Sequence, residues 1–300
     1  MRIFVTGATG FIGSMVVHEL LEARHQVVGL ARSDRAAAAL TAACADVHRG
    51  ALEALDSLRS GATAADGVIH LAYTSFTNAA EYTNTGIVDL RAVEAIGTAL
   101  EGSNKPFVVT SGTLGLKLGR LGTEEDAGDP DSPAAPRVAS ENAAIALAGR
   151  GVRSSVIRLA PSVHGPGERG FIPILINIAR TKGFSAYVDD GSNRWPAVHR
   201  LDAARLFRLA VEVAPAGSRL HGVGDEGVPF RVIAEVIGRH LNLPVVSISH
   251  KEADAHFGWV SFVVSADNPT SNKLTQEIVG WRPVHPALIP DLEQGHYFND

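Results

Sequence analysis

A glycine-rich turn at residues 7–13 constrains the fold of this chain more than any other segment. It follows a short apolar run, Ile3 to Val5, of the kind that forms a buried β-strand. An apolar pattern with helical spacing begins inside the turn, at Phe11, Ile12, Met15, Val16 and Leu20. Because glycine interrupts regular structure and the hydrophobic period changes here, the segment predicts a strand, a turn and a helix.

The glycines of this turn are spaced G-x-x-G-x-x-G, and each has its own physical role. Gly7 permits a tight turn, Gly10 lets the backbone approach a pyrophosphate, and Gly13 lets the helix pack closely on the strand. The N-terminus of the following helix presents unpaired N–H groups and the positive end of its dipole, which favour an anion. Glycines that serve only flexibility are the alternative. The strand–turn–helix context favours a dinucleotide site, which we assign to Gly7, Thr9, Gly10, Phe11, Ile12 and Gly13.

Composition and charge narrow the class of protein. Of the 300 residues, 45% are hydrophobic, which is enough to bury a substantial core and excludes a disordered chain. The net charge of -5 shows no basic excess, so we expect no nucleic-acid partner. Cys44 is the only cysteine, which excludes an internal disulfide framework. Since no apolar stretch reaches the ~20 residues of a membrane span and no leader precedes the first strand, we expect a soluble cytoplasmic protein without a membrane partner.

Strand and helix patterns alternate along the first half of the chain. After the first helix, apolar strands are predicted at 26–31, 45–49, 67–72, 106–110 and 153–159, separated by helical patterns at 34–43, 52–59, 81–100 and 135–149. Apolar strands that alternate with helices imply a parallel sheet covered on both faces. We therefore predict an α/β fold with a Rossmann-like, doubly wound parallel sheet, whose ligand lies at the carboxyl ends of the strands.

The alternation ends after Ala160, in a loop rich in glycine and proline. We predict a dinucleotide-binding domain over residues 1–165, to which residues 198–225 return. Residues 166–300 are expected to form most of a small C-terminal substrate lobe, because their predicted elements are short and mixed.

The end of the second predicted strand indicates which dinucleotide binds. In such folds an acidic residue at this place binds the ribose hydroxyls of NAD, whereas an arginine accommodates the 2′-phosphate of NADP. Here the strand is followed by Arg32 and Ser33, and the first carboxylate is Asp34. Both preceding side chains can donate hydrogen bonds to a phosphate. We predict NADP(H), with NAD(H) and a solvated Arg32 as the alternative.

Further motifs resemble the extended branch of the short-chain dehydrogenase/reductase family, which is the branch of NAD-dependent epimerases and dehydratases. They extend over nearly the whole chain, at residues 6–13, 68–72, 109–113, 158–167, 190–192 and 198–202. The resemblance implies that Leu71, Ala72 and Tyr73 lie close to the ribose and nicotinamide of the cofactor. It also implies that Pro161 to Val163 flank the nicotinamide amide and that the protein forms a homodimer.

The Y-x-x-x-K catalytic pair of that family is missing. Its tyrosine exchanges a proton with the substrate, and its lysine lowers the pKa of the tyrosine and holds the ribose. In the matching helix, Arg137 takes the tyrosine place and Glu141 the lysine place, so the chain resembles an atypical member. Ala51 replaces an aspartate near the adenine. Trp195 stands where members acting on nucleotide sugars carry an arginine for the diphosphate, which argues against such a substrate, although Arg194 is adjacent.

Groups that can polarise a carbonyl remain at the fifth predicted strand and on the following helix. A developing alkoxide needs a hydrogen-bond donor or a positive charge, and we predict Ser111, Thr113 and Arg137 for this role. Arg137 cannot be the acid, because a guanidinium keeps its proton at ordinary pH, so water or a hydroxyl would relay the proton. Binding of a cofactor phosphate or a surface carboxylate by Arg137 is an equal alternative, and Tyr73 is a second candidate proton donor.

Histidines offer weaker candidates. His164 and His199 fall in loops of the expected cleft and could relay a proton, although a structural hydrogen bond is the commoner role. His250 and His256 are spaced so that they fall on different faces of a helix, and we predict no metal site.

Together these features predict an NADP(H)-dependent oxidoreductase that reduces a small aldehyde or ketone by hydride transfer. A non-catalytic NADP(H)-binding sensor that answers to a protein partner is one alternative, favoured by the missing tyrosine and lysine. An epimerase or dehydratase that keeps its cofactor bound and acts on a sugar derivative is the other.

Overall fold

The computed structural model describes residues 1–73, 78–132 and 134–299. Its largest element is a seven-stranded sheet in the order β10-β6-β5-β4-β1-β2-β3, with every neighbouring pair parallel. The strands are β1 (Arg2–Thr6), β2 (Gln26–Ala31), β3 (Asp46–Arg49), β4 (Gly67–His70), β5 (Pro106–Gly112), β6 (Arg153–Leu159) and β10 (Ser218–Gly222). The strand order reverses between β1 and β4, and the predicted doubly wound α/β fold is confirmed.

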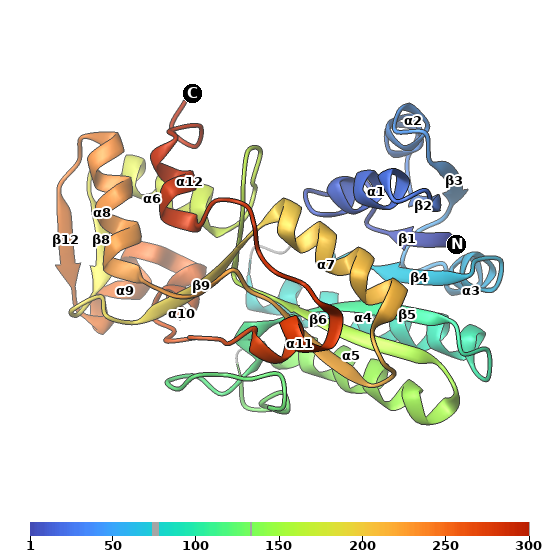
Figure 1. Cartoon of the computed structure of the whole chain (residues 1–300). Helices are drawn as coiled ribbons and strands as arrows, with labels where there is room; N and C mark the ends of the chain where they lie inside the picture. Colours follow the sequence, from blue (N-terminus) through green and yellow to red (C-terminus); the bar gives the residue numbers. More distant parts are fainter. Residues whose placement is uncertain (74–77, 133, 300) are drawn as a thin grey trace.

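Helices cover both faces of this sheet, which is why its central strands can be apolar throughout. On one face lie α1 (Gly13–Glu22) and α7 (Arg200–Val213), and on the other lie α4 (Ala79–Leu100) and α5 (Ala135–Ala146) (Figure 1). Helices α2 (Asp34–Ala42) and α3 (Leu55–Thr63) flank β2 and β3. Within the described part of the chain, none of the helices combines the length and apolar character needed to cross a bilayer.

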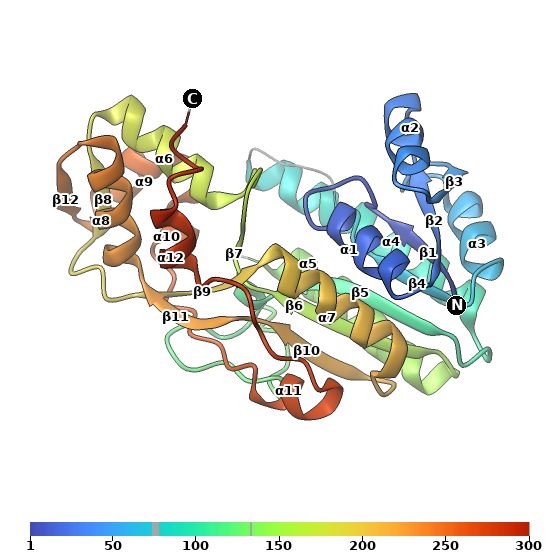
Figure 2. The same ribbon diagram turned by 45° about the horizontal axis from the view of Figure 1, so that its top comes forward.

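The remaining elements gather into a second cluster with its own apolar core (Figure 2). It contains two small sheets, one of β7 (Ser162–His164), β9 (Arg194–His199) and β11 (Asp225–Pro229), the other of β8 (Ser185–Val188) and β12 (Val245–Ile248). Its helices are α6 (Phe171–Lys182), α8 (Phe230–Leu241), α9 (His250–Phe257), α10 (Ser261–Val264) and α12 (Leu288–Glu293). A short 3-10 helix at Gly258–Val260 follows α9, and two others, at Thr113–Gly115 and Leu147–Arg150, follow β5 and α5 of the large sheet.

Three later elements belong to the large sheet and not to this cluster. Strand β10 extends the sheet at the edge of β6, and α7 packs against α1. Helix α11 (Lys273–Val279) packs against β10 and α7, so that Val279 and Trp281 join the core of the large sheet. The chain thus crosses between the two clusters more than once.

The junction of β1 and α1 is packed more tightly than any side chain would allow. Gly7 has a φ angle of +69°, a conformation that glycine adopts without strain. A β-carbon on Gly7 would lie 2.7 Å from the Ala72 amide nitrogen, and one on Gly13 would lie 2.0 Å from the Gly7 carbonyl oxygen. Both contacts are with backbone, which cannot move aside as a flexible side chain can. Glycine is therefore required at both positions.

We expect Gly13→Ala to destabilise the protein by about 3 kcal/mol, because the added methyl group overlaps a carbonyl at the start of α1. Chemical denaturation would measure this change. Gly149→Ala is the matched control, since no heavy atom lies within 4 Å of a β-carbon there, and it should leave stability unchanged or slightly raised. Equal effects of the two substitutions would contradict the packing explanation.

Candidate functional site

The carboxyl ends of β1, β4, β5 and β6 bring the predicted cofactor and catalytic segments to one edge of the sheet. Gly7 begins the turn after β1, Leu71 follows β4, Ser111 lies at the end of β5, and Pro161 follows β6. Because parallel strands end at the same edge, these segments face one site beside the reversal of strand order. The predicted wall residues are all partly exposed there, namely Leu71, Ala72, Tyr73, Pro161 and Val163.

The turn between β1 and α1 has the geometry of an anion site. Gly10 donates its amide to the Gly7 carbonyl at 2.9 Å, which closes the turn. Helix α1 receives no side-chain cap from the described residues. The amides of Ser14 and Met15 donate to the Gly10 and Ile12 carbonyls, each at 3.0 Å, so the Gly13 amide at the helix start is the one that remains for a ligand. Thr9 is exposed, and Phe11 and Ile12 are half-buried. The residues present fit the pyrophosphate of a dinucleotide.

The residues after β2 carry an uncompensated positive charge. The Ser33 hydroxyl accepts a hydrogen bond from the Ala36 amide and so caps α2, while Asp34 pairs with Arg49 at 2.7 Å. Arg32 is exposed and makes no hydrogen bond or ion pair with the described residues. The Asp34 carboxylate, the first after β2 in the sequence, is thus already paired, and the guanidinium of Arg32 remains open to a ligand.

Arg137, which occupies the tyrosine place, lies against Tyr73. Its Cζ atom is 3.7 Å from the centroid of the Tyr73 ring, and its Nη1 atom is 3.7 Å from Oδ2 of Asp89 on α4. Asp89 is buried, so the carboxylate that Arg137 meets is not the surface group that one alternative had assumed. The Arg137 side chain keeps 17% of its surface exposed, which leaves it accessible beside Tyr73.

A hydrogen-bonded chain links Asp89 to the cofactor turn through His70. His70 Nε2 lies 3.1 Å from Asp89 Oδ1, and its Nδ1 lies 2.8 Å from the Thr6 hydroxyl, which accepts from the Ala72 amide. Burial by itself raises the pKa of Asp89, but the hydrogen bond from His70 and the charge of Arg137 bring this pKa below its usual range. Asp89 is therefore an ionised partner for Arg137.

Sequence reasoning missed Asp89, although a signal was present. Asp89 precedes Ala92, Val93 and Ile96 at helical spacing, so it occupies the buried face of α4. A carboxylate on the apolar face of a helix requires a buried partner. That pattern predicts a buried partner for Asp89 but does not identify it, and the structure shows that His70 and Arg137 are the partners.

Glu141, in the lysine place, is buried and holds two arginines. Arg158 on β6 donates to it from Nε at 3.0 Å, and Arg219 on β10 donates at 3.1 Å. Burial raises the pKa of Glu141, but the hydrogen bonds and charge of Arg158 outweigh this and lower it, with a smaller contribution from Ser111. The network ties α5 to the sheet and replaces the cation that the family places near the ribose.

The two predicted hydroxyls at the end of β5 are less accessible than Arg137. Thr113 is fully buried and donates to Asn268 Oδ1 at 2.7 Å, and Asn268 Nδ2 donates back to the Thr113 carbonyl at 3.0 Å. Ser111 is also buried, beside Glu141. Of the three predicted polarising groups, Arg137 alone is partly exposed.

The prediction that His164 and His199 fall in loops is wrong, because they occupy paired positions at the ends of β7 and β9. His164 Nδ1 lies 2.8 Å from Asp291 Oδ2, and the His199 ring accepts a hydrogen bond from the Leu201 amide at the start of α7. Burial lowers the pKa of His199 to about 4, so its ring is neutral near pH 7. Both rings line a pocket of about 120 Å³ with Asp202 and His285. No group of His, Cys, Asp and Glu within the described ranges has an arrangement suited to a metal ion.

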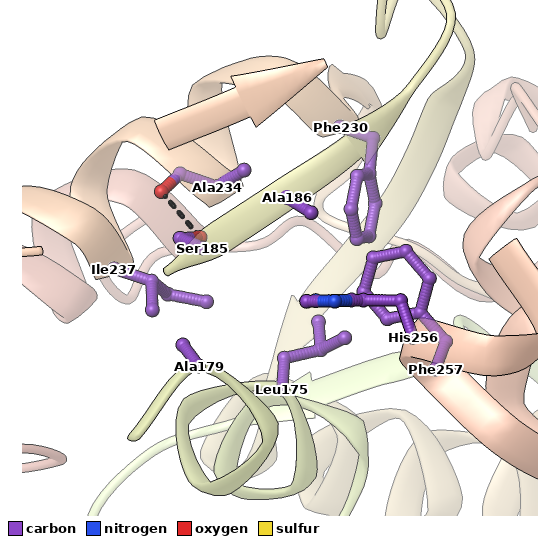
Figure 3. Close-up of a pocket in the computed structure, with 9 residues that line it drawn as sticks. All are labelled: Leu175, Ala179, Ser185, Ala186, Phe230, Ala234, Ile237, His256 and Phe257. Atoms are coloured by element: carbon purple, nitrogen blue, oxygen red, sulfur yellow. Dashed lines mark hydrogen bonds between the residues drawn. The ribbon is translucent and has the colours of Figure 1, made fainter. Parts of the chain in front are cut away.

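A smaller cavity lies inside the second core (Figure 3). It encloses about 10 Å³ between α6, β8, α8 and α9. Its lining is mostly apolar, and the Ser185 hydroxyl donates to the Ala234 carbonyl and not into the space. At this size it holds at most one water molecule, so it is a packing void and not a ligand site.

Comparison with known proteins agrees with this geometry. The model of the NAD dependent epimerase/dehydratase family matches residues 3–221, which include the glycine turn and the ends of β4, β5 and β6. The chain belongs to this family. The expected resemblance to epimerases and dehydratases is thereby confirmed, and the protein is of the NAD(P)-dependent epimerase/dehydratase type.

Individual relatives span nearly the whole chain. The uncharacterized protein C2A9.02 of Schizosaccharomyces pombe is 49% identical over 99% of this chain and 100% of its own length. A 4-hydroxy-2-methyl-3-oxo-4-farnesyl-3,4-dihydroquinoline-1-oxide ketoreductase of Stigmatella aurantiaca is 26% identical over 90% of this chain and 84% of its own. The structure of the dTDP-glucose 4,6-dehydratase DesIV of Streptomyces venezuelae with NAD and TYD bound shares the fold, with a TM-score of 0.76 and 21% identity over 99% of this chain and 96% of that one.

Glu168, in the loop after β7, is expected to make the stability of the fold depend on pH. It is buried and accepts a hydrogen bond from the Tyr297 hydroxyl at 2.7 Å, and burial raises its pKa from 4.5 to about 7. Because the folded pKa is raised, the protonated carboxyl stabilises the fold fully below pH 4.5, and this contribution is lost as pH rises through about 7.

Glu168→Gln should therefore be more stable than the parent above pH 7, by up to about 3 kcal/mol, and should lose the decline in stability between pH 4.5 and 7. Thermal unfolding at a series of pH values would show this. Glu235→Gln on α8, where the side chain is 43% exposed, is the control and should keep the parental profile. An unchanged profile in Glu168→Gln would contradict the assignment.

Proposed function

We propose that this protein is an NADP(H)-dependent reductase of a small aldehyde or ketone. The observation that carries the proposal is the position of Arg137, a partly exposed cation in the tyrosine place of a family whose cofactor turn is intact here. A positive charge at that place can stabilise the oxygen of a carbonyl as it becomes an alkoxide. The ketoreductase among the relatives supports this class of reaction.

Arg32 supports NADP(H) as the cofactor. Arg32 directly follows β2, the strand that in this fold ends beside the adenosine ribose. The carboxylate of the neighbouring Asp34 is already paired with Arg49. An arginine without a carboxylate partner suits the 2′-phosphate of NADP, whereas the diol of NAD would need a free carboxylate.

When bound, the reduced nicotinamide supplies the hydride, and the protein's part is orientation and charge. Arg137 stabilises the developing negative charge, and its own position is held by Asp89 and by the ring of Tyr73. Since a guanidinium does not release its proton near pH 7, the proton comes from water or from a hydroxyl. Tyr73, directly beneath Arg137, stays a candidate for this donor.

The two other functions are weaker candidates. An epimerase acting on a nucleotide sugar would need a cation for the diphosphate, but Trp195 is fully buried and donates to the Val263 carbonyl, while Arg194 is paired with Asp267. A non-catalytic NADP(H) sensor is favoured by the buried Glu141 in the lysine place. The cytoplasmic location and the homodimer remain predictions.

Arg32→Ala should weaken NADPH binding by about tenfold to hundredfold, because a charge-assisted hydrogen bond to the 2′-phosphate is lost. The affinity for NADH should change by less than about threefold. Isothermal titration calorimetry with both cofactors measures the two effects. Arg59→Ala, which removes an exposed arginine paired with Asp56 on α3, is the control. Equal losses for NADPH and NADH would contradict recognition of the 2′-phosphate.

Arg137→Gln should lower kcat for aldehyde reduction by about a hundredfold or more, the usual cost of removing an oxyanion-stabilising donor. Its NADPH affinity should stay close to that of the parent. The double variant Ser111→Ala/Thr113→Ala provides the comparison, with thermal unfolding to verify both folds. If the double variant loses turnover and Arg137→Gln does not, the hydroxyls polarise the carbonyl. If the parent itself binds NADPH and turns over no carbonyl in a broad panel, the sensor is the better hypothesis.

A further inference from the structure

Arg200, the first residue of α7, lies beside the cofactor turn. Its Cζ atom is 5.1 Å from the centroid of the Phe11 ring, close enough for a cation–π contact. Phe11 belongs to the turn between β1 and α1, whereas Arg200 directly follows β9 of the second cluster. The guanidinium therefore lies at the boundary between the two clusters, where β7 rises beside the N-terminal end of α7 (Figure 2).

The loop after β7 leaves room for this side chain. A β-carbon on Gly165 would lie 3.2 Å from Arg200 Cγ, and one on Gly167 would lie 4.0 Å from Nη1. Both glycines have positive φ angles, +136° and +84°. Arg200 is thus confined between Phe11 and the loop that enters the second cluster.

Arg200 makes no hydrogen bond or ion pair with the described residues, and its Nε atom is buried without an acceptor. Other half-buried or buried arginines in the described part of the chain have acceptors. Arg158 pairs with Glu141 and Arg208 with Glu19, whereas Arg153 and Arg205 donate to backbone carbonyls. A guanidinium that is half removed from water and has no counter-charge is unfavourable unless a ligand supplies one. The missing partner is therefore an anion.

The N-terminus of α1 is the anion-binding feature next to Arg200. The turn that contains Phe11 leads into that helix, which receives no side-chain cap from the described residues. We propose that Arg200 binds the pyrophosphate of the dinucleotide together with the N-terminus of α1, so that the phosphates contact both a helix N-terminus and a guanidinium. The assignment rests on the nucleotide site of the proposed function and adds to it a residue outside the glycine turn.

In this assignment the two arginines of the site bind different phosphates of the cofactor. Arg32 follows β2 and faces the 2′-phosphate, whereas Arg200 faces the pyrophosphate. Because Arg200 also contacts the loop at Gly165, a bound pyrophosphate would connect the cofactor turn with the second cluster. An anionic group of the substrate is the other possible source of the counter-charge, and the probes below distinguish the two.

The test compares Arg200→Gln with Arg200→Lys in calorimetric titrations with ADP, adenosine 2′-monophosphate and NADPH. Loss of a charge-assisted contact should weaken ADP and NADPH binding by about tenfold or more in Arg200→Gln and by less in Arg200→Lys. Adenosine 2′-monophosphate lacks the pyrophosphate, so its affinity should change by less than about twofold. Arg231→Gln on α8, an exposed arginine paired with Glu235, is the control and should match the parent. Thermal unfolding verifies that each variant is folded.

Two results would overturn the assignment. One is an ADP affinity that is equal in Arg200→Gln and the parent. The other is a selective rise in KM for an anionic carbonyl such as glyoxylate, with ADP binding unchanged, which would assign Arg200 to the substrate. Binding of ADP requires neither turnover nor a preference for NADPH. A protein that reduces no aldehyde but loses ADP affinity on Arg200→Gln would therefore contradict the reductase and leave the role of Arg200 intact.

Discussion

The close approach of three backbone segments at the end of β1 is the constraint on which the rest of the structure depends. Gly7 touches the backbone after β4, and α1 begins against the Gly7 carbonyl at Gly13. These contacts bring the N-terminus of α1 to the reversal of strand order, where the ends of the parallel strands converge. A β-carbon on Gly13 would push α1 away from the Gly7 carbonyl, and one on Gly7 would push the turn away from the backbone after β4. The other site residues are positioned relative to this junction by the register of β4, β5 and β6.

The second determinant is the placement of charge where the family carries its tyrosine and lysine. Arg137 and Glu141 are one turn apart on α5, and each has a buried partner of opposite charge. Buried charges are tolerated only with such partners. Arg137 and Glu141, in the places of the tyrosine and lysine, therefore require Asp89 and Arg158. The result is a partly exposed cation and a buried ion pair one turn apart on α5. That arrangement supports stabilisation of charge more than proton transfer.

Residues from the end of the chain complete the site from a distance. Asn268 holds Thr113, Asp291 holds His164, and Tyr297 holds Glu168 in the loop after β7. Each contact joins segments separated by more than a hundred residues, and each satisfies a polar group that would otherwise be buried without a partner. The C-terminal segment is therefore tied by hydrogen bonds to the end of β5, to β7 and to the loop after β7.

The sequence by itself determined the parallel sheet, the cofactor turn and the family, because hydrophobic period and glycine spacing are local and survive in the order of residues. That Arg32 and Arg137 are cations of the site stays a prediction from the sequence. The sequence did not show that Asp89 meets Arg137, that Asn268 occupies the Thr113 hydroxyl, or that Arg200 lies beside Phe11. Those facts depend on which distant segments pack together, and only the tertiary structure decides this, since a single sequence carries no local signal for the partner of a buried charge.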